Sequence, residues 1–100
     1  MLRTFNYNEN VRLSEHFNSS EFRCKCGKIH NYTVDTNLID KLERLYSALN
    51  ASKGIISSGY RCTTHDRAVG GNGSGQHTKG TACDIIFSDK NNKPISSKIV

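Results

Sequence analysis

The sequence predicts one small domain that combines helices with strands. Apolar residues recur at helical spacing from Leu38 to Leu49, and residues 55–58 and 81–87 are short apolar runs of the kind that forms strands. A length of 100 residues suits a single domain with one modest core. Hydrophobic residues make up 35% of the chain and charged residues 23%, which favours a folded chain over a disordered one. We therefore expect residues 1–100 to form a single domain.

The N-terminal part of the chain gives only weak signals. Residues 1–16 contain few apolar anchors, so we expect a poorly anchored arm that wraps over the surface. Asn18 is followed three residues later by Glu21, a capping-box pattern that predicts a short helical turn. Residues 24–33 are expected to form a loop.

The long helix is the clearest element of the sequence. Its apolar stripe consists of Leu38, Ile39, Leu42, Leu45, Tyr46 and Leu49. Thr33, Asp35 or Thr36 could supply its N-cap, and residues 50–54 supply stop signals.

Two shorter elements follow this helix. Gly59 is expected to end the strand at 55–58 and to begin a turn. Thr63 or Thr64 could cap a short helix, which Gly70 would terminate.

The last third of the chain is expected to contain a loop, a strand and the start of a helix. Residues 70–75 form the loop, and Cys83 in the strand at 81–87 is expected to be a small core residue. Pro94 is typical of the first residue of a helix. Because no stop signal follows it, we expect the C-terminal part of the domain to be missing from these residues.

Charge and hydropathy narrow the choice of partners. The net charge is +5, but Lys and Arg never form a run of three and no nucleic-acid-binding signature is present, so we expect no nucleic-acid partner. No apolar run approaches the ~18 residues of a membrane span. The first residues lack the apolar core of a secretory signal, so we expect synthesis in the cytoplasm with the cysteines reduced. The oligomeric state is left open.

Two residues in the segment 74–84 suggest a metal site. His77 precedes Asp84 by seven residues, and Asp84 is followed by an apolar run. Burying its carboxylate in such a strand would be costly unless it were paired or metal-bound. A His nitrogen and a carboxylate oxygen suit zinc. Because two ligands do not define a site, a loop His hydrogen-bonded to a buried Asp remains the alternative.

Arg61 directly follows a predicted strand and turn, so it could stand at the edge of a cleft. Its planar fork would bind a carboxylate or stabilise an oxyanion. A surface salt bridge is the alternative interpretation.

Taken together, these segments resemble the zinc D-Ala-D-Ala carboxypeptidases and phage endolysin-type peptidases, whose fold and metal site are shared with the hedgehog signalling domain. The resemblance covers about residues 13 to 87. The motifs that carry it are Leu13-Ser14-x-x-Phe17, Ser20-Glu21-Phe22, Cys24-Lys25-Cys26-Gly27, Ser58-Gly59-Tyr60-Arg61-Cys62, Gly70-Gly71 and Gln76-His77-x-x-Gly80-x-Ala82-x-Asp84.

The resemblance implies an α+β fold in which a small antiparallel sheet packs against helices. It implies zinc as the cofactor, with His77 and Asp84 as two of its three protein ligands. Arg61 would bind and polarise the substrate, and Ser74 and Gln76 would contact it. The implied substrates are peptidoglycan stem peptides, cut by D-Ala-D-Ala carboxypeptidase or by L,D or D,D endolysin-type action. Phage or prophage origin and action on the cell wall follow from the same resemblance.

The sequence departs from this family in two respects. Gly75 stands where many relatives have Ser, and no His follows His77, although the family places its catalytic Glu and third ligand on a later segment. We therefore expect the 100 residues alone to be inactive. His16, His30, His65 and Glu21 are candidate substitutes, but a surface or N-terminal-turn role explains His65 more simply, and a capping role explains Glu21 more simply.

Two further hypotheses remain. Cys24, Cys26 and His30 could bind a second, structural metal, for which the sequence shows no fourth ligand. The domain could also be a non-catalytic module of the same fold that binds a metal or a peptide.

Overall fold

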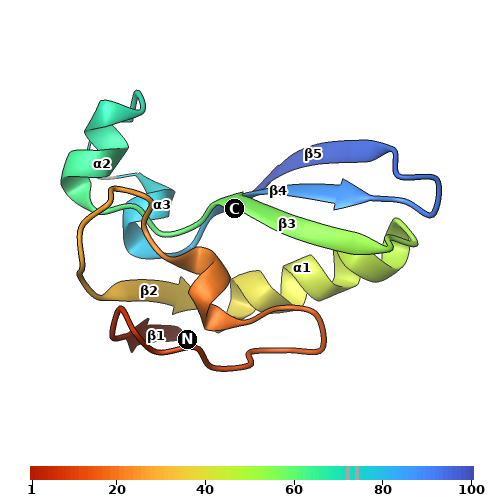
Figure 1. The fold of residues 1–100 in the computed structure, drawn as a ribbon, viewed down its shortest axis with the longest axis horizontal. Coiled ribbons are helices and arrows are strands. Elements are labelled where there is room, and N and C mark those ends of the chain that lie inside the picture. The colour runs from red at the N-terminus through yellow and green to blue at the C-terminus, as the bar shows by residue number, and fades with distance from the viewer. Residues whose placement is uncertain (72, 74) are drawn as a thin grey trace.

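The computed structural model describes residues 1–71, 73 and 75–100, and it has the α+β architecture that the sequence predicts. Figure 1 shows two antiparallel sheets and the helices around them. In chain order the elements are β1 (Leu2–Phe5), the 3-10 helix η1 (Ser19–Phe22), β2 (Tyr32–Asp35), α1 (Thr36–Ala48), β3 (Lys53–Ser58), α2 (Thr63–Ala68), α3 (Gln76–Lys79), β4 (Cys83–Ser88) and β5 (Pro94–Ile99). Within this described part of the chain, no helix is long and apolar enough to cross a bilayer.

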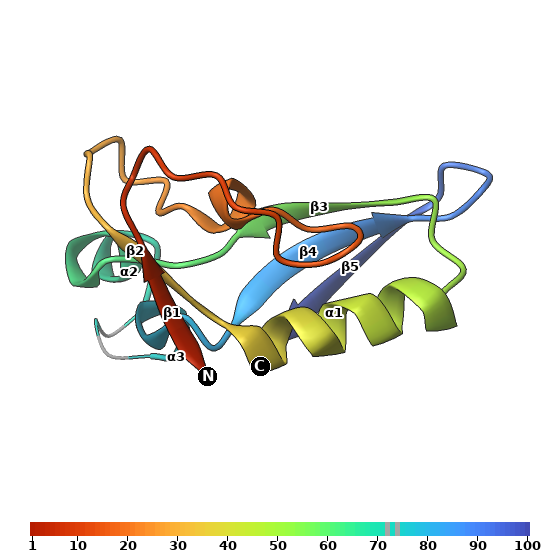
Figure 2. The ribbon, with the colours of Figure 1, turned by 90° about the horizontal axis from the view of Figure 1, so that it is seen from below.

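The larger sheet has the strand order β3-β4-β5, and α1 lies along one of its faces (Figures 1 and 2). On β4 the side chains of Cys83, Ile85 and Phe87 are buried, whereas those between them are half-buried. The buried face packs against Leu42 and its neighbours on α1. This alternation places the core between helix and sheet and leaves the face that bears Asp84 more open.

The long helix and the capping box are confirmed. Of the three candidate N-caps of α1, the structure uses Asp35, whose carboxylate accepts a hydrogen bond from Asn37 N–H. Glu21 accepts a 2.6 Å hydrogen bond from Asn18 N–H at the start of η1. The cap of α2 differs from the prediction, because Cys62 Sγ accepts from His65 N–H.

The N-terminal residues do not form the poorly anchored arm that was expected. Strand β1 pairs along its whole length with β2, and Phe5 is 3% exposed. The Phe5 ring stacks on Tyr32 with a centroid separation of 5.4 Å. One aromatic anchor and a strand pairing thus fix a segment that looked too polar to be held.

The helix predicted at Pro94 is also wrong, since residues 94–99 form strand β5. Pro is tolerated at the first residue of an edge strand, where it need not donate to the ladder. The preceding turn is held by Asp89, whose carboxylate accepts from Asn91 N–H and Lys93 N–H. This turn directs the chain back along β4. The antiparallel pairing with β4 makes residues 94–99 a strand in place of a helix.

Candidate active site

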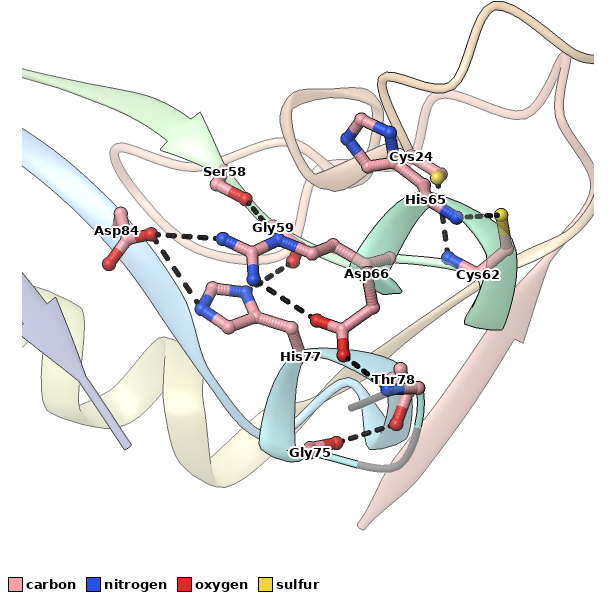
Figure 3. A network of polar contacts seen from close by, with 12 residues as sticks. Cys24, Ser58, Gly59, Cys62, His65, Asp66, Gly75, His77, Thr78 and Asp84 are labelled. Carbon is pink, nitrogen blue, oxygen red and sulfur yellow. Dashed lines mark hydrogen bonds and ion pairs between the residues drawn. The ribbon is translucent and has the colours of Figure 1, made fainter. Parts of the chain in front are cut away.

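Residues distant in sequence converge at one end of the larger sheet, where β4 begins and where α2 and α3 approach it (Figure 3). A pocket of about 270 Å³ opens there. Its lining consists of Arg61, Asp66, Gly71, Gly75, Gln76, His77, Lys98 and Val100. The pocket therefore contains Arg61, Gln76 and His77, three of the residues singled out from the sequence.

His77 lies in α3 and is 4% exposed. Its Nδ1 is 2.9 Å from the carbonyl oxygen of Gly59. Because a carbonyl oxygen can only accept, Nδ1 carries the proton, and the neutral ring presents a lone pair at Nε2. Nε2 is buried, has no hydrogen-bond partner among the described residues, and faces Asp84 (Figure 3).

Gly80 sets the path from this histidine to the next strand. It ends α3 in the left-handed conformation with φ 77°, which favours glycine. A Cβ atom at this position would lie 2.7 Å from the carbonyl carbon of Thr33, and the Gly80 carbonyl accepts from Asp35 N–H. The close approach attaches the end of α3 to β2 and α1, so the His77 backbone is firmly placed.

Asp84 stands on the more open face of β4, and its side chain is 34% exposed. Its Oδ2 is 3.7 Å from His77 Nε2 and 3.5 Å from Arg61 Nη2. The separation from His77 is longer than a hydrogen bond. The alternative was a loop His hydrogen-bonded to a buried Asp. In the structure the two side chains are not hydrogen-bonded to each other, and Asp84 is only partly buried.

Arg61 is anchored along its whole guanidinium group. Nε donates to Ser58 Oγ at 3.0 Å, Nη1 donates to Asp66 Oδ1 at 3.1 Å, and Nη2 faces Asp84. Ser58 follows an irregularity in the β3–β4 register, a feature that commonly re-aims a side chain near a functional site. The Arg61 side chain is only 17% exposed, so it is not the surface ion pair that was the alternative.

Asp66 is the residue that sequence reasoning missed. It is 2% exposed, and its carboxylate accepts from Arg61 Nη1 and from Gly73 N–H at 3.0 Å. The pKa of this carboxyl is lowered most by the hydrogen bond from Arg61 and next by the hydrogen bond from Gly73. The only signal in the sequence was an acidic residue shortly after Arg61 and before two glycines. In the structure, Asp66 positions the Arg61 guanidinium.

The donor set at this site fits zinc. His77 Nε2 is an orphaned buried nitrogen, and an Asp84 oxygen lies opposite it at a separation that leaves room for an ion between them. An imidazole nitrogen and a carboxylate oxygen are both zinc ligands. Among the described residues, no third His, Cys, Asp or Glu donor clusters with this pair.

The other candidates from the sequence lie elsewhere or at the rim. The Gln76 Oε1 atom accepts a 2.5 Å hydrogen bond from Thr81 at the edge of the pocket, and Ser74 lies outside the described residues. Glu21 caps η1, as expected, and His16 lies outside the pocket and contacts Glu43. The candidate constellation that the structure brings together is therefore Arg61, Asp66, His77 and Asp84.

A family model described as Peptidase M15 matches residues 15–99, nearly the whole chain. The chain belongs to this family. No curated protein and no solved structure gives a significant match. This match confirms the resemblance inferred from the motifs. M15 peptidases are zinc-dependent metallopeptidases, and a peptide is their class of substrate.

Proposed function

We propose that this M15 chain is a zinc-dependent hydrolase of peptidoglycan stem peptides, either a D-Ala-D-Ala carboxypeptidase or an endolysin-type L,D or D,D endopeptidase. The observation that carries the proposal is the buried, unpartnered His77 Nε2 facing Asp84 beside an anchored arginine. Zinc in such a place acidifies water and polarises a peptide carbonyl.

The residues of this chain would divide the work as follows. His77 and Asp84 hold the metal, with the His77 ring kept in the required tautomer by Gly59. Arg61 offers the second N–H group of each Nη atom to a substrate carboxylate or to the developing oxyanion. Asp66 fixes the direction of Arg61 and so reduces the reorganisation needed when substrate binds. Gln76 at the rim and Ser74 would contact the substrate peptide.

A third ligand and a general base complete such a site, and we propose that residues beyond these 100 supply both. The 100 residues alone would then bind zinc weakly and leave peptides uncut, since two protein ligands hold a metal poorly. Sequencing the coding DNA past the Val100 codon tests this part. A continuing frame that encodes a Glu and a His is the expected result, and an immediate stop codon would contradict it.

The activity is tested with the complete gene product on purified peptidoglycan, with released peptides separated and identified by mass spectrometry. We expect cleavage at bonds to D-amino acids, its loss on chelation, and its recovery with added zinc. The His77→Ala variant should be inactive, whereas His16→Ala, which changes a histidine outside the pocket, should retain activity. A zinc-loaded preparation that leaves the peptidoglycan intact would refute the proposal.

A non-catalytic module that binds a metal or a peptide is the second candidate. The observation that favours it is that only two donors, His77 and Asp84, face each other within the described residues. Such a module would bind stem peptides in a zinc-dependent way without cutting them. The peptidoglycan experiment above separates the two functions, because binding without release of peptides would be its outcome.

A further inference from the structure

A second cluster of metal-ligating side chains lies apart from the His77 pocket. Cys24, Cys26 and His30 lie in the loop after η1, and Cys62 is the N-cap residue of α2. One donor atom from each of the four lies within 4.8 Å of the other three. Ligands of tetrahedral zinc with Zn–S bonds of about 2.3 Å are roughly 3.8 Å apart, so only small adjustments would close the cluster around an ion.

The histidine of the cluster has a fixed tautomer. His30 Nδ1 donates a 2.7 Å hydrogen bond to the carbonyl oxygen of Asn31. The neutral ring therefore presents the lone pair of Nε2, which lies 3.1 Å from Cys26 Sγ. A ligating histidine whose other nitrogen donates to a carbonyl is the usual arrangement in metal sites, where that hydrogen bond sets the orientation of the ring.

Backbone N–H groups point at two of the sulfur atoms. Cys62 N–H donates to Cys24 Sγ at 3.3 Å, and His65 N–H donates to Cys62 Sγ at 3.4 Å (Figure 3). These hydrogen bonds hold the two sulfur atoms in place within the cluster. Cys24 is 7% exposed and the other three residues are half-buried, so the cluster is largely shielded and still open to an ion.

We propose that Cys24, Cys26, His30 and Cys62 form a structural Zn²⁺ site with three sulfur ligands and one nitrogen ligand. Three thiolates and one imidazole are a known donor set of structural zinc, and four protein ligands leave no position for a substrate. Cys62 is the fourth ligand that the sequence did not reveal, because it follows Cys24 by 38 residues.

The position of the site indicates what it would do. Cys62 directly follows Arg61, and Tyr60 N–H already donates to the carbonyl of Phe22, just before the loop that carries Cys24. An ion bound by both segments would join the loop to the turn that presents Arg61. Structural zinc sites contribute folding free energy directly, so the ion would stabilise this junction.

Cobalt(II) titration of the reduced protein tests the proposal, because a sulfur-to-cobalt charge-transfer band reports thiolate ligation directly. We expect this band, with the intense visible bands of tetrahedral cobalt, at one equivalent, and we expect zinc to displace the cobalt. The control variants His77→Ala and Cys83→Ala should retain the band, since neither residue belongs to the cluster.

The variants Cys26→Ser and His30→Ala each remove one half-buried ligand, so they are the least disruptive to folding. Each should weaken cobalt binding by more than about tenfold, since even the outer-shell partners of a metal site contribute that much. If Cys26→Ser does not fold, mass spectrometry after thiol alkylation of the native protein decides: zinc should protect Cys24, Cys26 and Cys62, and chelation should expose them.

Three results would overturn the proposal. They are the absence of a thiolate band under reducing conditions, a band that Cys26→Ser leaves unchanged, and thiols that stay protected after chelation until a disulfide reductant is added. The last result would show that the cluster forms a disulfide in place of a metal site. None of these outcomes depends on peptidase activity, so failure here is distinguishable from failure of the proposed function.

Discussion

Gly71 offers a test of the packing that positions Arg61. A Cβ atom at Gly71 would lie 2.5 Å from Asp66 Cγ and 2.6 Å from Asp66 Oδ1, far inside van der Waals contact. The Asp66 carboxylate cannot swing away freely, because Arg61 and Gly73 both donate to it. Gly71→Ser should therefore strain the site and displace the carboxylate from Arg61.

The expected cost follows from the size of the clash. Forcing extra atoms into a well-packed place typically costs about 1–3 kcal/mol. For a domain of this length, each kcal/mol lowers the melting temperature by about 4–8 °C, so the loss should be on the order of 4–24 °C. Gly75→Ser is the matched control: nothing lies within 4 Å of a Cβ there, and Ser is a favourable N-cap for α3.

The assay is thermal and urea unfolding of the reduced, metal-free protein, followed by circular dichroism. Gly71→Ser should show the predicted drop, and Gly75→Ser should stay within a few tenths of a kcal/mol of the parent. Equal stability of the two variants would mean that Asp66 does not approach the backbone of Gly71, and the account of how Arg61 is positioned would fail.

Three further predictions concern the core, the pH dependence of stability and the role of the guanidinium. Leu42 is fully buried, so Leu42→Ala should lower the free energy of unfolding by about 2–5 kcal/mol in urea titrations, and a loss near zero would contradict the described core. Partial burial raises the pKa of Glu43, but hydrogen bonds from His16 and Ser14 outweigh it and lower that pKa below its usual 4.5. The stability that the ionised Glu43 carboxylate contributes is therefore present above pH 4.5 and is lost as pH falls through the folded-state pKa. The stability deficit of Glu43→Gln should accordingly shrink in acid, and a deficit independent of pH would show that the ionised carboxylate is not what stabilises the fold. Arg61→Lys keeps the charge but loses the fork, so in the complete gene product it should reduce kcat/KM for stem peptides by roughly 100-fold or more while zinc content stays unchanged; unaltered kcat/KM would remove Arg61 from the substrate site.

The sequence predicted those elements whose signals are local. The periodicity of α1 and the capping box at Asn18 both depend on residues within a few positions of one another. For the cap of α1, the sequence offered three candidates, of which the structure uses Asp35. The prediction of a helix at residues 94–99 was wrong because a proline suits the start of a helix or of an edge strand. Only the pairing with β4 decides that these residues form a strand.

The candidate site was predictable in the same uneven way. The motif around His77 and Asp84 is contiguous and specific, so it could be singled out, and the structure places Arg61 beside Asp84. The roles of these residues stay a prediction. Asp66 escaped notice because one carboxylate in a short helix has no pattern of its own. Cys62 was not linked to Cys24 because that contact spans distant parts of the chain, and sequence spacing carries no information about it.

In the proposed site, His77 presents the lone pair of a buried Nε2 to a zinc ion shared with Asp84. Long-range proton–nitrogen NMR of the imidazole rings measures this directly, and it separates His77 from His30. We expect that free His77 carries its proton on Nδ1, that zinc shifts the Nε2 resonance, and that Asp84→Asn greatly weakens this response. A His77 ring protonated on Nε2, or an Nε2 resonance that zinc leaves unmoved at every concentration, would contradict it.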